Sequence, residues 1–373
     1  MWWLIVMVFG VYYVLLMFLC IGWWRSVKFR AASGHQVSQP FISVIIPVRN
    51  EADTIAHLLN SLAEQDFDFK NFEVVVVNDH SSDKTEEVVN AWMKVNPEIS
   101  LILLNQDAKH HGKKAALACG IAHAKGEIMV TTDGDCVVQP GWLSSIADAF
   151  SPQVKLLIGT VRLRDDRSWF SKLQVVEFAS LVGTGAATLG WGIPTMCNGA
   201  NLAFRKSVFE EVNGYAENEH IASGDDEFFL RKVASQYPRG IRFNNQSVGV
   251  VETNASKSIT DFFSQRIRWA GKWKAHGIGF SSALAFFIFI FHSVTILLPV
   301  LAGLQFLSWM VVLSLLIGKL LLEAVFLFPV LRFCTGRFYP QTFLMLQFIY
   351  PFYVVCFGLA ANLLSAEWKG RKI

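Results

Sequence analysis

The chain has 373 residues, of which 53% are hydrophobic, and it carries 33 Lys and Arg against 30 Asp and Glu. It is too apolar for an ordinary soluble protein of this length, and the net charge of +3 includes no basic block of the kind that binds nucleic acid. Six cysteines without a Cys-x-x-Cys pair suggest neither a zinc site nor a disulfide framework. The composition therefore indicates a membrane protein with no nucleic-acid partner.

The chain begins with an apolar run over residues 2–24, which is long enough to span a bilayer and has tryptophans at both ends as interfacial anchors. Arg25, Lys28 and Arg30 follow this run, so the positive-inside rule places what comes next in the cytoplasm. A cleaved signal peptide is disfavoured because no charged segment precedes the run and no small-x-small site follows it. We expect a transmembrane helix over residues 1–25 and then a cytoplasmic domain.

The middle of the chain alternates apolar, β-branched runs with helical patterns, which predicts an α/β fold with a mainly parallel sheet and helices on both faces. Ligands of such folds gather at the carboxyl ends of the strands. Asp79, Asp133 and Asp135 each follow a predicted strand, so we expect the functional site there. The predicted strands span residues 41–46, 72–77, 101–104 and 126–130.

Asp133 and Asp135 flank Gly134 directly after a predicted strand. In extended backbone this spacing sends both carboxylates to the same side, and the glycine allows a ligand to approach closely. Two carboxylates suit one hard cation such as Mg²⁺ or Mn²⁺, which usually completes its shell with water and substrate phosphates. The pattern predicts a metal-bound diphosphate, although the same spacing also occurs by chance in loops.

Two segments after residue 150 have more than one interpretation. Residues 169–191 are apolar but rich in Gly, Ala and Thr and contain Glu177, which fits an interfacial or substrate-channel helix and equally a buried core helix. Asp225 and Asp226 lie in an acidic cluster that opens a helix. Capping of the helix N-terminus by carboxylates would explain that cluster if it stood alone.

The C-terminal part is predicted to be membrane. Residues 281–332 suffice for two spans, within which Lys319 and Glu323 can pair on one helix face, either along an acceptor path or as a structural bridge. Residues 343–364 form a last apolar run interrupted by Pro351. If that run spans the membrane, the basic tail ends outside, against the charge rule, so the run is re-entrant or a boundary before it is misplaced.

Seven motifs follow one another along roughly residues 41–275: Ser43 to Glu51, Val77 to Thr85, Gly112 to Leu117, Asp133-Gly134-Asp135, Gly199 to Arg205, Gly224-Asp225-Asp226 and Gln265 to Trp269. In this order they resemble the family 2 glycosyltransferases, and specifically the membrane-bound branch that contains the cellulose, chitin, hyaluronan and poly-N-acetylglucosamine synthases.

The resemblance implies a GT-A-type, Rossmann-like nucleotide-sugar-binding domain over residues 40–257. An interfacial amphipathic helix with the Gln-x-x-Arg-Trp motif would follow over residues 258–277, where aromatic and basic side chains alternate. Residues 278–366 would then form a transmembrane region of two to three spans. The expected location is a bacterial inner membrane, with the catalytic domain in the cytoplasm.

The resemblance also implies roles for individual residues. Asp226 matches the catalytic base of the family's Thr-Glu-Asp motif, and Asp225 replaces its Glu, so either aspartate is a candidate base. Asp135 would be the direct ligand of Mg²⁺ or Mn²⁺, with Asp133. The expected donor-binding residues are Pro47, Asn50, Glu51, Asp79, Lys113, Asp133 and Arg268. The expected acceptor-binding residues are Asn198, Gly199, Asn201, Gln265 and Trp269.

The implied activity is an inverting, metal-dependent transfer of a sugar from a nucleotide sugar, expected to be UDP-linked, to a lipid or growing polysaccharide. The motif from Gln265 to Trp269 favours a processive β-linked polysaccharide synthase, and the short membrane part favours single transfer to a lipid. A non-catalytic nucleotide-sugar-binding membrane protein is the alternative from another class. It is disfavoured because such a protein has no need of the base Asp226.

Overall fold

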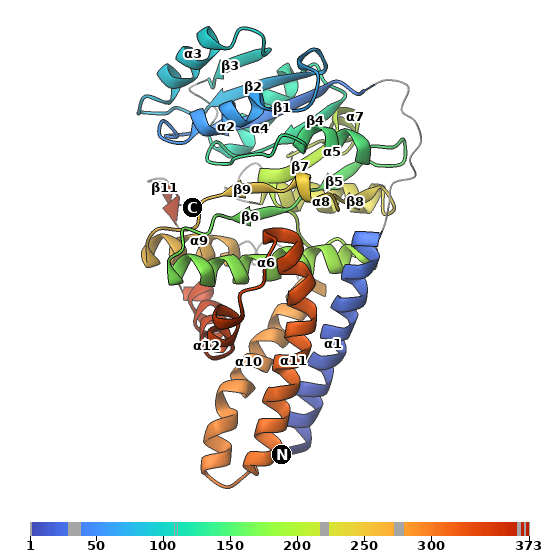
Figure 1. Ribbon diagram of the computed structural model, residues 1–373, viewed down its shortest axis with the longest axis vertical. Helices are drawn as coiled ribbons and strands as arrows, with labels where there is room; N and C mark the ends of the chain where they lie inside the picture. The colour runs from blue at the N-terminus through green and yellow to red at the C-terminus, as the bar shows by residue number, and fades with distance from the viewer. Residues whose placement is uncertain are drawn as a thin grey trace. The chain divides into compact units, whose positions relative to one another are not determined.

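The computed structural model describes residues 2–28, 39–107, 109, 111–216, 224–271, 280–363, 367–368 and 371–372 (Figure 1). Arg30 and residues 272–277 of the predicted interfacial helix lie outside this set. The chain forms two compact units, which we call the sheet unit and the helical unit. The sheet unit comprises Trp24–Arg164 and Thr188–Asn254, and the helical unit comprises Met1–Trp23, Asp165–Ala187 and Ala255–Ile373.

A seven-stranded sheet in the order β3-β2-β1-β4-β7-β5-β8 organises the sheet unit. β1 runs parallel to β2 and β4, and β2 runs parallel to β3, which confirms the predicted parallel sheet for its first four strands. β7 is antiparallel to both β4 and β5, so the full sheet is mixed. The strands are β1 (Ile42–Val48), β2 (Phe72–Asn78), β3 (Leu101–Asn105), β4 (Ile128–Thr131), β5 (Leu156–Ile158), β7 (Leu202–Arg205) and β8 (Ile241–Phe243).

The central strands are near-continuous apolar runs because parallel strands are buried on both faces. Every residue of β2 is buried, and helix α4 (Lys113–His123) packs directly on this part of the sheet. A Cβ at Gly120 would lie 2.6 Å from Ile45 Cγ2 and 3.0 Å from Val77 Cγ2, so glycine is what allows this close approach. The other helices of the unit are α2 (Ile55–Ala63), α3 (Thr85–Val95), α5 (Trp142–Ala149), α7 (Lys206–Glu211) and α8 (Asp225–Gln236).

Two short strands form a second, parallel ladder in the sheet unit. These are β6 (Val161–Leu163) and β9 (Val251–Thr253). An antiparallel bridge between Val137 and Glu252 ties β9 to the chain just after β4. The end of β9 is thereby brought beside the loop that carries Asp133 and Asp135.

The helical unit contains most of the apolar sequence. Five described helices are long and apolar enough to cross a membrane: α1 (Trp2–Lys28), α6 (Trp169–Gly190), α10 (Phe280–Gly303), α11 (Trp309–Thr335) and α12 (Pro340–Leu363). Residues 281–332, predicted to suffice for two spans, do form two helices, α10 and α11, and α12 is one helix that continues through Pro351. The apolar window of α6 is 61% buried, against 17–28% for the other four, which favours its interpretation as a helix packed within protein.

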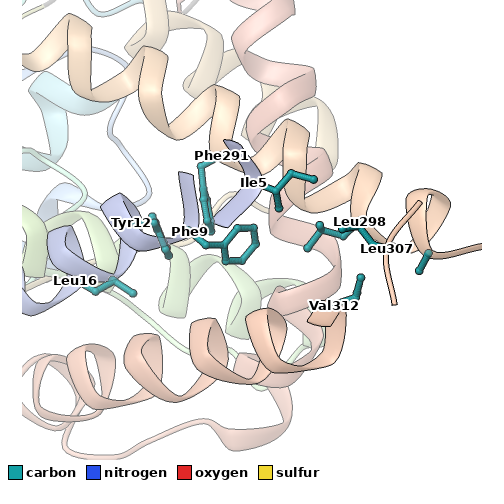
Figure 2. Close-up of a cluster of buried hydrophobic side chains, with 9 residues drawn as sticks. Ile5, Phe9, Tyr12, Leu16, Phe291, Leu298, Leu307 and Val312 are labelled. Atoms are coloured by element: carbon teal, nitrogen blue, oxygen red, sulfur yellow. The ribbon is translucent and has the colours of Figure 1, made fainter. Parts of the chain in front are cut away.

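An apolar stripe on α1 packs against α10 and α11 (Figure 2). Ile5, Phe9, Tyr12 and Leu16 recur at helical spacing on one face of α1 and are all buried. The ring of Tyr12 stacks on Phe291 of α10 with 3.7 Å between centroids. Spans that share such a stripe are held together by close packing, since lipid itself offers no hydrophobic driving force.

A polar network connects the same helices. Lys319 and Glu323 form the predicted pair on α11, with 2.9 Å between Nζ and the carboxylate. Tyr12 of α1 donates to Glu323 at 2.5 Å, and the Gln347 amide of α12 both accepts from Lys319 and donates to Glu323. Three helices therefore contribute to one partly buried network, an arrangement that favours the structural bridge over the acceptor path.

Replacing Lys319 with Met is expected to lower stability by about 1–2 kcal/mol, since the partly buried Glu323 loses its cation but keeps its hydrogen bonds from Tyr12 and Gln347. The thermal unfolding midpoint in detergent measures this. The double variant Lys319→Met/Glu323→Gln should recover part of the loss. Lys94→Met, at an exposed position of α3, is the control. If Lys319→Met and Lys94→Met unfold at the same temperature, Lys319 does not stabilise the protein.

Candidate active site

Asp79 follows β2 directly and is 2% exposed. Its Oδ2 accepts a hydrogen bond from the Gly112 N–H at 3.1 Å, and its Oδ1 lies 3.1 Å from His80 Nδ1. Its own N–H donates to the Val48 carbonyl at 2.8 Å. The Asp79 carboxylate is thus fixed between the ends of β1 and β2 and the residue that precedes α4.

His80 and His111 lie beside Asp79, and neither was predicted from the sequence to be a site residue. The rings of His80 and His111 lie 4.5 Å apart between centroids. Candidate ligand atoms of Asp79, His80 and His111 all lie within 4.8 Å of one another, a grouping that could hold a metal ion. Their positions in the sequence indicate this closeness to the site, because His80 follows Asp79 and His111 precedes the Gly112 motif.

The predicted donor loop after β1 is tied to the loop after β2. Pro47 is the second-last residue of β1 and pairs with Val77 of β2. Asn50 has left-handed backbone, with φ 53°, and its side-chain oxygen accepts from the Ser82 N–H at 2.8 Å. The Glu51 N–H donates to the Thr85 hydroxyl at 2.8 Å. These contacts give Asn50 and Glu51 a part in shaping the loops around Asp79.

The carboxylates of Asp133 and Asp135 are both partly exposed after β4, and each has a different partner. Asp133 Oδ1 lies 2.6 Å from Lys113 Nζ at the start of α4. Asp135 Oδ2 accepts a hydrogen bond from the Thr253 hydroxyl at the end of β9, at 3.1 Å. The loop is therefore held from both sides, and its two carboxylates offer the hard oxygen ligands that Mg²⁺ and Mn²⁺ prefer.

Lys113 connects this loop to the acidic start of α8. Its Nζ lies 3.8 Å from Asp225 Oδ2, in addition to its contact with Asp133. Burial alone would lower the pKa of Lys113, but the carboxylates of Asp133, Asp225 and Asp226 raise it above its ordinary value. The lysine is therefore a permanent cation at neutral pH, surrounded by three carboxylates.

Gly199 lies against the same cluster. Its N–H donates to Asp226 Oδ2 at 3.1 Å, and its carbonyl accepts from the Thr131 hydroxyl at the end of β4, at 2.6 Å. Asn198, beside it, accepts from the Ala200 N–H at 2.9 Å and so caps the short 3₁₀ turn that contains Gly199. This turn brings a glycine backbone next to the candidate base.

Asn201 has a different environment from the one predicted. It is 2% exposed, and its amide nitrogen donates to the carbonyls of Thr160 and Gly249 at 2.8 and 2.9 Å. Its oxygen accepts from Trp142 Nε1 at 3.1 Å. Both amide hydrogens are used inside the protein, which argues against the predicted contact between Asn201 and an acceptor and gives the residue a structural role.

The remaining predicted residues belong to the helical unit. Gln265, Arg268 and Trp269 lie on α9 (Ile259–Gly271), and all three are half-buried. The sheet unit itself brings together Asp133, Lys113, Gly199, Asp225 and Asp226 in one cluster, and ties Pro47, Asn50 and Glu51 to the loops around Asp79.

Acidic side chains thus gather at the carboxyl ends of the parallel strands of this α/β sheet, and two family models match the chain. "Glycosyl transferase family 2" matches residues 43–212, and "Glycosyl transferase family group 2" matches residues 128–356. The chain belongs to the family 2 glycosyltransferases, and the predicted GT-A-type fold with flanking apolar helices is confirmed.

Individual relatives cover parts of the chain. It is 33% identical over 134 residues to the undecaprenyl-phosphate 4-deoxy-4-formamido-L-arabinose transferase of Edwardsiella ictaluri, an alignment that covers 35% of this chain and 40% of that protein. It is 27% identical over 233 residues to the poly-beta-1,6-N-acetyl-D-glucosamine synthase of Staphylococcus aureus, covering 61% and 53%. The matched region is thus about half the length of these relatives or less.

Among solved structures that resemble the chain is one that matches nearly its whole length. It is the mannosyltransferase PcManGT of Pyrobaculum calidifontis in complex with GDP-Man and Mn²⁺, with a TM-score of 0.63, 20% identity, and coverage of 96% of this chain and 95% of that one. At this identity the likeness supports the fold.

Proposed function

We propose that this glycosyltransferase moves a sugar, with inversion, from a nucleotide-sugar donor, expected to be UDP-linked, to a lipid or growing polysaccharide at the cytoplasmic face of a bacterial inner membrane. The observation that carries the proposal is the position of Lys113, 2.6 Å from Asp133 and 3.8 Å from Asp225. Lys113 thereby connects Asp133, the carboxylate expected at the donor diphosphate, to the start of α8, which carries the candidate base Asp226. Donor and acceptor chemistry are thus served by one cluster.

Asp226 is proposed as the general base. The acceptor hydroxyl must lose a proton as it attacks the anomeric carbon, and a positioned carboxylate can take it. The N–H groups of Gly199 and Glu227 each donate to one Asp226 oxygen, at 3.1 and 2.8 Å, and so orient the carboxylate. Asp225 is the carboxylate that approaches Lys113, and we assign it the role of holding that lysine.

The leaving diphosphate needs positive charge. Asp133 and Asp135 would hold Mg²⁺ or Mn²⁺, and the bound ion would supply charge neutralisation to the departing diphosphate. The Lys113 ammonium, already in contact with Asp133, adds a second positive charge at the same place. Two sources of positive charge suit a step in which negative charge builds on the leaving group.

Asp79, with His80 and His111, is proposed to receive the nucleobase. The Asp79 carboxylate can accept from a base N–H, and the two imidazole rings offer flat faces beside it. The roles of Gln265, Arg268 and Trp269 at the diphosphate and acceptor rest on the Gln-x-x-Arg-Trp motif. Retention in a membrane is supported by the five long apolar helices.

The proposal is tested with protein purified in nanodiscs, Mn²⁺ or Mg²⁺, and a panel of nucleotide sugars, with and without membrane lipid extract. Nucleotide release and product size are followed together. A lipid product one sugar larger identifies single transfer, and a ladder identifies a processive synthase. Protein that binds a Mn²⁺–nucleotide complex but transfers from no donor in the panel would support the non-catalytic alternative and contradict the proposal.

Gly199→Ala tests whether the close approach of the Gly199 backbone to the acidic cluster matters for turnover. A Cβ there would lie 3.6 Å from Lys113 Nζ, an ordinary contact, but only 3.1 Å from Asp225 Oδ2, so the Asp225 carboxylate must shift by a few tenths of an ångström. We expect kcat to fall about 10–100-fold while the protein still folds, because small misplacements of catalytic groups carry such costs. Gly10→Ala, where a Cβ would meet no atom within 4 Å, is the control. Unchanged kcat in Gly199→Ala would show that this spacing is not critical.

A further inference from the structure

A buried ion pair lies at the meeting point of α6, α9 and α12 in the helical unit. The side chains of Arg266 on α9 and Glu177 on α6 are 3% and 5% exposed. Two guanidinium nitrogens, Nη2 and Nε, donate to the two Glu177 oxygens at 2.5 and 3.2 Å. Tyr353 of α12 donates to the same carboxylate at 3.0 Å. The Arg266 guanidinium is therefore held in one plane by partners from two other helices.

The same guanidinium contacts two side chains of the Gln-x-x-Arg-Trp motif. Its Nη1 donates to Gln265 Oε1 at 2.6 Å. Its carbon lies 4.2 Å from the centre of the Trp269 ring and 4.5 Å from the centre of the Phe262 ring. The contact with Gln265 fixes which way its amide is turned, with the oxygen toward Arg266, and the contact with Trp269 covers one ring face.

Helix packing alone gives no reason for this arrangement. Removing two charges from water is costly, and apolar side chains of similar volume often hold helices together as well or better. An arginine fork supplies what apolar groups lack, which is a fixed plane with donors in set directions. Here the guanidinium of Arg266 links Glu177 and Tyr353, which lie on two other helices and which we call the clamp, to Gln265 and Trp269.

We propose that Arg266 is a positioning residue for the acceptor, acting through Gln265 and Trp269. Glu177 and Tyr353 hold its guanidinium, which in turn presents the Gln265 amide NH₂ as a donor and sets the plane of the half-buried Trp269 ring as a stacking surface for a sugar. This inference rests on the proposed function, since the acceptor roles of Gln265 and Trp269 belong to it.

Arg266→Lys tests the proposal because it keeps the charge opposite Glu177 and loses the fork. We expect the acceptor KM to rise about tenfold, which corresponds to the loss of about one charge-assisted hydrogen bond. The donor KM and the acceptor-independent hydrolysis of donor should stay at the wild-type values. Arg337→Lys, an exposed arginine of the same unit, is the matched control. Equal losses in hydrolysis and transfer by Arg266→Lys would overturn the proposal.

The double variant Glu177→Met/Arg266→Met separates positioning from stability. Removing both charges together should leave the thermal unfolding midpoint near the wild-type value, because no buried charge is left unpaired. The acceptor KM should nevertheless stay raised. A double variant with normal acceptor KM would show that Arg266 serves only to neutralise Glu177, and would overturn the proposal.

A readout without turnover keeps the inference separate from the proposed function. Protein labelled with 5-fluorotryptophan, in which Trp269→Phe assigns the Trp269 resonance, should show a single narrow ¹⁹F signal for Trp269. In Arg266→Lys that signal should broaden or split as the ring loses its support. An unchanged signal would refute the positioning role even if transfer is observed. If the wild type transfers no sugar but the signal changes, the clamp stands and the proposed function fails.

Discussion

Asp226→Asn is expected to lower kcat by about 10²–10⁴-fold, the usual worth of a general base, while donor affinity stays nearly unchanged. Asparagine keeps the shape of the side chain and can still accept from the Gly199 or Glu227 N–H, but it cannot take a proton from the acceptor. The turnover rate at saturating donor and acceptor measures the loss. Titration with the nucleoside diphosphate and Mn²⁺ checks that binding is retained.

Asp225→Asn is the matched comparison, because the two residues are neighbours on the first turn of α8. Asp225 faces Lys113 at 3.8 Å, and Lys113 would still be paired with Asp133 after the change. We expect a loss of roughly tenfold, as for one weakened charge contact. If Asp225→Asn is the more damaging variant and Asp226→Asn keeps most turnover, the base is Asp225.

Asp135→Asn is expected to remove metal-dependent donor binding. A carboxylate that ligates the ion contributes charge as well as a bond, so we expect metal affinity to fall at least about 100-fold, since even changes to outer partners of a metal ligand cost about 10–100-fold. Binding of donor at increasing Mn²⁺ measures this, with chelated wild-type protein as the reference for binding without metal. High Mn²⁺ should restore part of the lost donor affinity.

The control for this variant is Asp148→Asn, at an exposed position of α5 in the same unit. It changes the net charge equally and should leave the Mn²⁺ dependence as in the wild type. If Asp135→Asn also keeps the wild-type Mn²⁺ dependence, the metal is bound elsewhere. The group formed by Asp79, His80 and His111 would then be the next site to test.

The first half of the sheet could be predicted because its strands are long apolar runs that end in polar loops. Four of residues 72–77 are valine, and the structure buries the whole run in β2. The second half could not, because β5 and β8 have three residues each, which is too short to show a period. β7 runs antiparallel after the long α6, and no local pattern in the sequence encodes that direction.

The site divides along similar lines. The positions of Asp79, Asp133 and Asp135 at strand ends could be predicted, since each follows an apolar run, and the family resemblance added Lys113 and Asp226 as candidates. The contact between Lys113 and Asp225 is a tertiary one between two helix starts far apart in the sequence. The burial of Asn201 was equally hidden, because an asparagine in a motif looks the same whether it meets a ligand or the core.

The hydrogen bond between Tyr12 and Glu323 joins positions that are 311 residues apart. At about 5–20 residues per second, a ribosome needs roughly tens of seconds to travel that distance, during which α1 has left the exit tunnel and α11 does not yet exist. Tyr12 therefore has no bond to Glu323 while the whole sheet unit is synthesised. The packing of α1 against α11 is completed late in synthesis, and a chain interrupted before α11 lacks Glu323, the hydrogen-bond partner of Tyr12.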